Sequence, residues 1–82
     1  MAEPHGLVTE HRDDSSLLTE TTYQHGVRHG PYRDYWSNGQ VSLEGQYVNG
    51  LQEGEWRFYG SDGSLREVLQ FKGGREVVDW GE

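Results

Sequence analysis

The chain has 82 residues, of which 14 are acidic and 7 basic, giving a formal net charge of −7. This length fits a single domain over residues 1–82 with a marginal core, since small domains bury only about 60% of their unfolded surface. The acidic balance argues against nucleic acid and anionic membranes as partners, because both would repel the chain. The chain contains no cysteine and residues 1–11 show no signal peptide, so we expect a cytoplasmic location.

One chemical pattern recurs along the chain with a fixed 24-residue period. The recurring sets, each with members one period apart, are Tyr23, Tyr47 and Phe71; Gly26, Gly50 and Gly74; Tyr32, Trp56 and Trp80; Tyr35 and Tyr59; and Gly39 and Gly63. A fixed period of this size predicts an array of one small supersecondary unit. Such an array favours a binding surface over an enzyme with an enclosed active site.

The first predicted unit, residues 5–22, is a degenerate copy of the repeat. One period takes His5-Gly6 onto His29-Gly30, and it takes Leu17 onto Val41. The turn of this unit, at residues 13–15, lacks the glycine that later copies carry. Atypical end units are expected in repeat arrays, because they must cap the stack.

The next two units, residues 23–46 and 47–70, each predict two strands. Apolar residues alternate with polar ones, as in the series Val41, Leu43 and Tyr47, which is typical of strands with one face toward a core. We expect first strands at about 28–36 and 53–59 and second strands at about 40–48 and 64–72. Two-residue hairpin turns are predicted at the Asn-Gly of 38–39 and the Asp-Gly of 62–63, with looser turns at 48–50 and 72–74.

The last unit, residues 71–82, is truncated and provides only a first strand at about 76–80. Across all units we expect Tyr32, Trp56 and Trp80 to stack in one row, with Gly30 and Gly54 offering bare backbone to a neighbouring ring. Glycines 26, 50 and 74 can supply the positive φ of a turn. The predicted core residues are Tyr32, Tyr47, Trp56, Phe58 and Phe71.

Two segments carry the fullest motif. Gly30-Pro31-Tyr32, followed by Tyr35 and Asn38-Gly39, matches Gly54-Glu55-Trp56, followed by Tyr59 and Asp62-Gly63. This pattern resembles MORN repeats, and most closely the variant repeats of the small bacterial YwqK-like proteins, which are described as antitoxins. The resemblance implies an all-β fold, an elongated twisted sheet of consecutive antiparallel β-hairpins. It also implies an antitoxin or immunity function.

Three groups of residues are candidates for partner binding. Trp36 has no aromatic counterpart in the next unit, where Gly60 stands, so repetition does not explain it. Tyr35 and Tyr59 are predicted on the face opposite Tyr32, where Arg33, Arg57 and Arg66 would form a basic, aromatic strip or pair with Glu44 and Glu67. An acidic start, which includes Asp13, Asp14 and Glu20, forms either a solvated surface or a contact for a basic partner.

Other chemistries find little support in the sequence. His25 and His29 are four residues apart, but across a predicted turn, and no metal-binding motif surrounds them. We therefore predict no metal, no cofactor and no catalytic residue.

The functional prediction is a bacterial protein that binds a cognate toxin, with a basic nuclease as the first candidate, and occludes its active site. The alternative is an interaction scaffold or self-assembly module without an inhibitory role. Homodimerisation is left open, because exposed end strands favour edge pairing.

Overall fold

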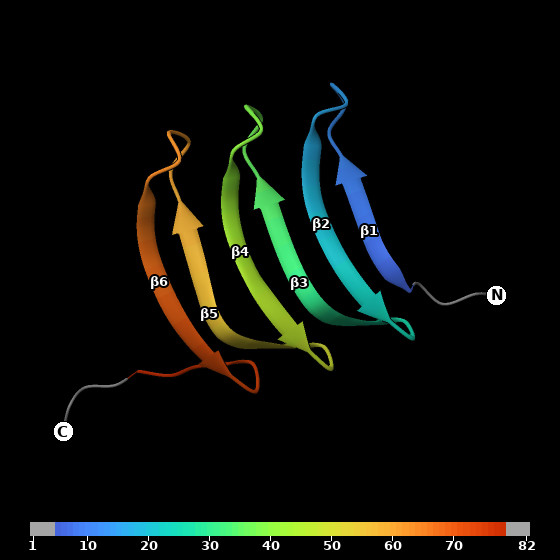
Figure 1. Cartoon of the computed structure of the whole chain (residues 1–82), viewed down its shortest axis with the longest axis vertical. Coiled ribbons are helices and arrows are strands. Elements are labelled where there is room, and N and C mark those ends of the chain that lie inside the picture. Colours follow the sequence, from blue (N-terminus) through green and yellow to red (C-terminus); the bar gives the residue numbers. More distant parts are fainter. Residues whose placement is uncertain (1–4, 79–82) are drawn as a thin grey trace.

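The computed structural model describes residues 5–78, which form a single antiparallel sheet of seven strands in chain order. Figure 1 shows the first six, β1 to β6, side by side in this order. The molecule measures 48 × 35 × 13 Å, so the sheet forms one thin layer. No helix in residues 5–78 is long and apolar enough to cross a membrane. The strands are β1 (Gly6–His11), β2 (Leu17–Gln24), β3 (Val27–Tyr35), β4 (Val41–Val48), β5 (Leu51–Tyr59), β6 (Leu65–Lys72) and β7 (Arg75–Glu76). The predicted all-β array of consecutive hairpins is confirmed, with strand bounds close to those expected.

The turns at the two edges of the sheet differ, and the sequence prediction had them reversed. Between β4 and β5, Asn49 and Gly50 have φ of 52° and 85°, which is the two-residue type I′ geometry. Between β3 and β4, only Gly39 has a positive φ, and Trp36 forms backbone hydrogen bonds with Gln40 and Gly39. The loops at 37–39 and 61–63 are therefore three-residue loops, and those at 25–26 and 49–50 are the tight turns.

Bulges recur with the repeat and bend the strands. The register shifts at Glu10/His11, Asp34/Tyr35 and Phe58/Tyr59, at the same position in each hairpin. Each bulge interrupts the usual alternation of side chains between the two faces. Val41 pairs with Tyr35, whereas Leu43 pairs with Phe58, which lies on the face opposite Tyr35. Val41 and Leu43 consequently lie on opposite faces, and the prediction that they share one is wrong.

The core lies on one face, which we call the aromatic face: Tyr32, Tyr47, Trp56 and Phe71. Trp56 is 1% exposed, and its ring centroid lies 5.7 Å from Tyr32, 5.1 Å from Tyr47 and 6.1 Å from Phe71. Each such pair contributes about 0.5–1.5 kcal/mol beyond the burial of its area. The predicted row of Tyr32 and Trp56 is confirmed, whereas Trp80 lies outside the described residues.

The glycine on which this cluster packs is Gly45, which the repeat pattern does not predict for this role. A Cβ at Gly45 would lie 2.1 Å from Cδ2 of Trp56, so the indole rests directly on this residue. Gly54 has open space where its Cβ would be, and that of Gly30 would meet Thr22. These two glycines instead provide positive φ, 118° at Gly30 and 74° at Gly54, where the register between hairpins shifts. Their predicted role as aromatic platforms is wrong.

Candidate protein-binding surface

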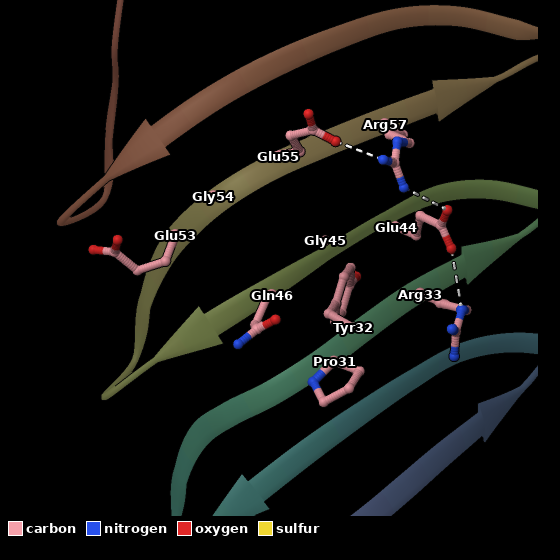
Figure 2. A pocket seen from close by; sticks show the side chains of 10 residues that line it. All are labelled: Pro31, Tyr32, Arg33, Glu44, Gly45, Gln46, Glu53, Gly54, Glu55 and Arg57. Atoms are coloured by element: carbon pink, nitrogen blue, oxygen red, sulfur yellow. Dashed lines mark hydrogen bonds and ion pairs between the residues drawn. The ribbon is translucent and has the colours of Figure 1, made fainter.

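The face opposite the aromatic cluster carries a row of charged side chains. On a strand, neighbouring residues point to opposite faces, so Arg33 and Arg57 lie opposite Tyr32 and Trp56. Glu44 lies between the two arginines, 3.3 Å from Arg33 Nε and 3.8 Å from Arg57 Nη1, and Arg57 also contacts Glu55 at 2.5 Å (Figure 2). We call the set Arg33, Glu44, Glu55 and Arg57, with Glu20, Tyr35 and Tyr59, the ion-pair face.

Tyrosine hydroxyls extend this row by a repeated contact. The Tyr59 hydroxyl donates to Glu44 Oε2 at 2.7 Å, and one repeat earlier the Tyr35 hydroxyl donates to Glu20. The hydrogen bond from Tyr59, followed by the interactions with Arg33, lowers the pKa of Glu44. Burial, and then the bond to Glu20, raises the pKa of Tyr35. At neutral pH the face therefore presents an ionised Glu44 beside neutral Tyr35 and Tyr59.

A shallow hollow of about 480 Å³ opens beside the ion pairs. Figure 2 shows Gly45 in the middle, with Pro31, Gln46 and Glu53 around one side and the charged row on the other. The hollow is open to solvent rather than enclosed. Such an opening has room for a protruding side chain of another molecule.

The three-residue loops lie side by side at the top of Figure 1, where they form what we call the loop edge, and they carry three aspartates, Asp13, Asp14 and Asp62. Asp14 accepts hydrogen bonds from the backbone and hydroxyl of Ser16, and Asp62 does the same with Ser64. These bonds lower the pKa of both aspartates. Asp14 thus has a structural role in its loop, and Asp13 is exposed beside it.

Trp36 joins this edge to the next hairpin. Its indole Nε1 donates to the backbone carbonyl of Tyr59 at 3.1 Å, and its side chain is 40% exposed. Arg12, one repeat earlier, donates in the same way to the carbonyl of Tyr35. Trp36 therefore shares a position with a residue that links successive repeats, and this structural role explains its presence without a partner. Its predicted role in binding stays a prediction.

The predicted candidates converge in part. Glu20, Tyr35 and Tyr59 share the ion-pair face, while Asp13, Asp14 and Trp36 lie at or next to the loop edge. The expected pairing of the arginines with Glu44 is present, but Glu67 pairs with Phe58 on the other face, and Arg66 approaches Asp62 at 4.0 Å. The predicted structural glycines 26, 39, 50 and 63 all have positive φ.

Sequence reasoning treated Glu44 only as an ion-pair partner and missed Glu53 and Glu55 as surface residues. The 24-residue step from Glu20 to Glu44, matched by that from Tyr35 to Tyr59, was the signal that could have identified the repeated Tyr–Glu pair. In the part of the chain that the structure describes, no three histidine or acidic side chains are grouped closely enough to hold a metal ion.

Taken together, the fold and its open faces define a β-hairpin repeat protein whose surfaces serve interaction with other molecules. A family model described as MORN repeat variant matches residues 28–49 and 52–72, more than half of the chain. The chain belongs to this family. The two matches correspond to the β3–β4 and β5–β6 hairpins. No curated protein and no solved structure matches the chain.

Proposed function

We propose that this protein is an inhibitor of the antitoxin or immunity type, which binds a toxin protein through the ion-pair face and occludes its active site. The observation that carries the proposal is the fixed arrangement of the side chains on this face. Its charged and tyrosine side chains are fixed by mutual bonds across β2 to β5, although they contribute little to stability. The arginine side chains are 45% exposed, and ion pairs at such sites contribute only about 0.2–1 kcal/mol.

Pre-organised side chains of this kind lower the entropic cost of binding, because fewer rotamers must be frozen when a partner docks. Tyrosine and arginine are also enriched among residues that dominate binding energy. The hollow over Gly45 gives the face relief that a flat sheet lacks. These features support recognition of another protein without any catalytic step, cofactor or metal.

The acidic charge supports a basic target. A net charge of −7 would attract a positively charged protein and speed its capture, and a basic nuclease is the candidate class that this favours. The rate of association should then fall as sodium chloride is added. An association rate that does not change with ionic strength would remove the electrostatic part of the proposal.

The test begins with a tagged pull-down from the native organism and identification of bound proteins by mass spectrometry. Each stoichiometric partner is then expressed alone and together with this chain. We expect one partner that arrests growth and is neutralised on co-expression. Several non-toxic partners would instead support the alternative function, an interaction scaffold without an inhibitory role.

A pair of charge variants then locates the contact. Asp13→Lys alters an exposed residue of the acidic loop between β1 and β2, and Glu76→Lys makes the same change on the exposed β7, at the far end of the sheet. We expect Asp13→Lys to slow association with the toxin clearly more than Glu76→Lys does. Equal effects would show that net charge matters and that the loop does not contact the partner.

A further inference from the structure

Two tight turns, at the lower edge of the sheet in Figure 1, are each held by a side chain from the same position of the repeat. Between β4 and β5, the backbone amide of Asn49 donates a hydrogen bond to Nδ1 of His29 at 3.0 Å. Between β6 and β7, the amide of Gly73 donates to Oε2 of Glu53. His29 and Glu53 are one 24-residue period apart. The two turns therefore share one kind of contact but use different acceptors.

The contact with His29 supports a turn residue in an unfavourable conformation. Strand pairing ends at Val48, so Asn49 lies outside it. Asn49 has a φ of 52°, in the left-handed region, which costs free energy for a residue with a Cβ, although asparagine adopts it more readily than most. The bond to His29 offsets part of this cost. The amide of Gly50 is held separately, by the carbonyl of Arg28.

The two acceptors respond differently to acid. A carboxylate accepts hydrogen bonds in its ionised form, which glutamate ordinarily keeps down to about pH 5. Imidazole accepts only in its neutral form, because both ring nitrogens carry hydrogen once it is protonated. Histidine is the side chain that ordinarily changes charge between about pH 5 and 8. Acidification through this range therefore removes the acceptor at His29 and leaves the one at Glu53.

We propose that His29 makes the β4–β5 turn sensitive to pH. Protonation of the imidazole releases the amide of Asn49 and loosens this turn, while the β6–β7 turn stays fixed. The contact contributes where imidazole is neutral, and its contribution is lost as pH falls through the histidine range. The open turn binds the additional proton, so the stability of the closed turn rises with pH. This device does not depend on the inhibitory role proposed above.

Few charged groups surround His29 in residues 5–78. By strand parity it lies on the same side of the sheet as Arg33. The residues beside it on β2 and β4 do not ionise: Thr22, Gln24, Gln46 and Val48. The ionisable side chains close to it in sequence or pairing on the other side of the sheet are Tyr23, Arg28 and Tyr47. On its own side, Glu53 of β5 pairs with Gln46, and its negative charge would stabilise an imidazolium.

The turn between β2 and β3 carries two more histidines. His5 lies one period before His29, and its ring centroid is 5.5 Å from that of His25, with 55° between the ring planes. Two imidazolium rings at this separation repel each other, so acid acts against this turn as well. The first two tight turns thus respond to acid, whereas the third has a glutamate in the equivalent position.

Exchange of single backbone amides with water, measured by nuclear magnetic resonance, tests the proposal. Protection factors, which correct for the intrinsic effect of pH on exchange, are compared for Asn49 and Gly73 from about pH 8 to about pH 5. We expect the protection factor of Asn49 to fall several-fold and that of Gly73 to stay constant. A parallel fall at both amides would show general loosening of the sheet and overturn the proposal, as would a constant factor at Asn49.

Variants of His29 separate the loss of the acceptor from other effects of acid. His29→Gln and His29→Glu, the second copying the next repeat, keep an acceptor oxygen that stays available over this pH range. Both should retain protection of Asn49 and remove its pH dependence. His29→Ala should show, at neutral pH, the low protection that the natural chain reaches in acid.

His11→Gln is the matched control, because His11 is an exposed histidine at the other end of β1 from these turns. We expect this variant to keep the pH profile of the natural chain at Asn49. A pH dependence that persists in both His29→Gln and His29→Glu, or that disappears in His11→Gln, would overturn the proposal, since another group would then control the turn.

Discussion

At the scale of single residues, Gly45 leaves the least room for a side chain of the glycines that the structure describes, with Trp56 Cδ2 2.1 Å from where its Cβ would be. Among residues 5–78, Gly45 and Gly60 are the two glycines that have an ordinary φ and no room for a Cβ. At Gly60 the Cβ would meet the guanidinium of Arg66. The two differ in what surrounds them, since Trp56 is buried and Arg66 is exposed. Replacing either glycine with alanine adds the same methyl group. A difference in stability between the two variants therefore reports the side chain that the methyl group displaces.

We predict that Gly45→Ala lowers the free energy of unfolding by about 1–3 kcal/mol, because the new methyl group must push a packed indole off the sheet. Gly60→Ala should cost much less, since the flexible end of Arg66 can swing into solvent. Urea unfolding followed by tryptophan fluorescence measures both. Equal losses for the two variants would show that Trp56 is not held against the backbone at position 45.

A second prediction concerns Ser15, which has a φ of 74° in the position that Gly39 and Gly63 hold in later loops. Left-handed backbone costs a residue with a Cβ roughly 1–2 kcal/mol, part of which glycine loses again through its greater freedom in the unfolded chain. Ser15→Gly should therefore stabilise the protein by about 0.5–1 kcal/mol in urea unfolding. The reciprocal change Gly39→Ser should destabilise it, and a loss of stability in Ser15→Gly would contradict the argument.

At the scale of elements, the sequence predicted the strands well because alternation and the 24-residue step reinforce each other. It failed where one extra residue changes the geometry. The Asn-Gly of 38–39 predicts a two-residue turn, yet Asn38 does not take a positive φ and only Gly39 does. The bulge that follows Asp34 separates Val41 from Leu43. Neither feature can be deduced from alternation, since both depend on how the paired strand is aligned.

The sequence predicts which residues lie on the ion-pair face, but not which of their side chains bond to one another. Parity placed Arg33 and Tyr35 on one face, and the repeat indicated which residues are equivalent. The convergence of two arginines and a tyrosine on Glu44 required the register of three strands at once. The sequence likewise shows no structural reason for Trp36, because its hydrogen bond reaches a carbonyl 23 residues away.

Glu44 gives the element-scale prediction on pH. Its pKa is lowered in the folded protein, chiefly by the Tyr59 hydrogen bond, so the stability that it contributes is present above the unfolded value near 4.5 and is lost as pH falls through the lower folded value. We expect the free energy of unfolding to decline on acidification from about pH 4.5. Asp14 and Asp62 act in the same direction, so Glu44→Gln should flatten the decline without removing it.

The matching control is Glu76→Gln, which removes a carboxylate from the exposed β7. We expect the pH profile of this variant to follow that of the natural chain in urea titrations between neutral pH and pH 3. If Glu44→Gln and Glu76→Gln leave identical slopes, the bonds around Glu44 do not favour its ionised form in solution.

At the scale of the whole molecule, stability is distributed unevenly along the array. In such proteins each repeat contacts only its neighbours, and end units are held from one side. The single fully buried aromatic side chain in residues 5–78, Trp56, lies on β5 against β4 and β6, whereas the side chains of β1 beyond Gly6 are exposed. The centre of the sheet should therefore open last.

Native-state hydrogen exchange tests this distribution. We predict that backbone amides of β4 and β5 exchange only through global unfolding, while those of β1 exchange through local fraying at a smaller free energy. Protection of β1 equal to that of β5 in dilute solution would contradict the prediction and show that the sheet unfolds as one cooperative unit.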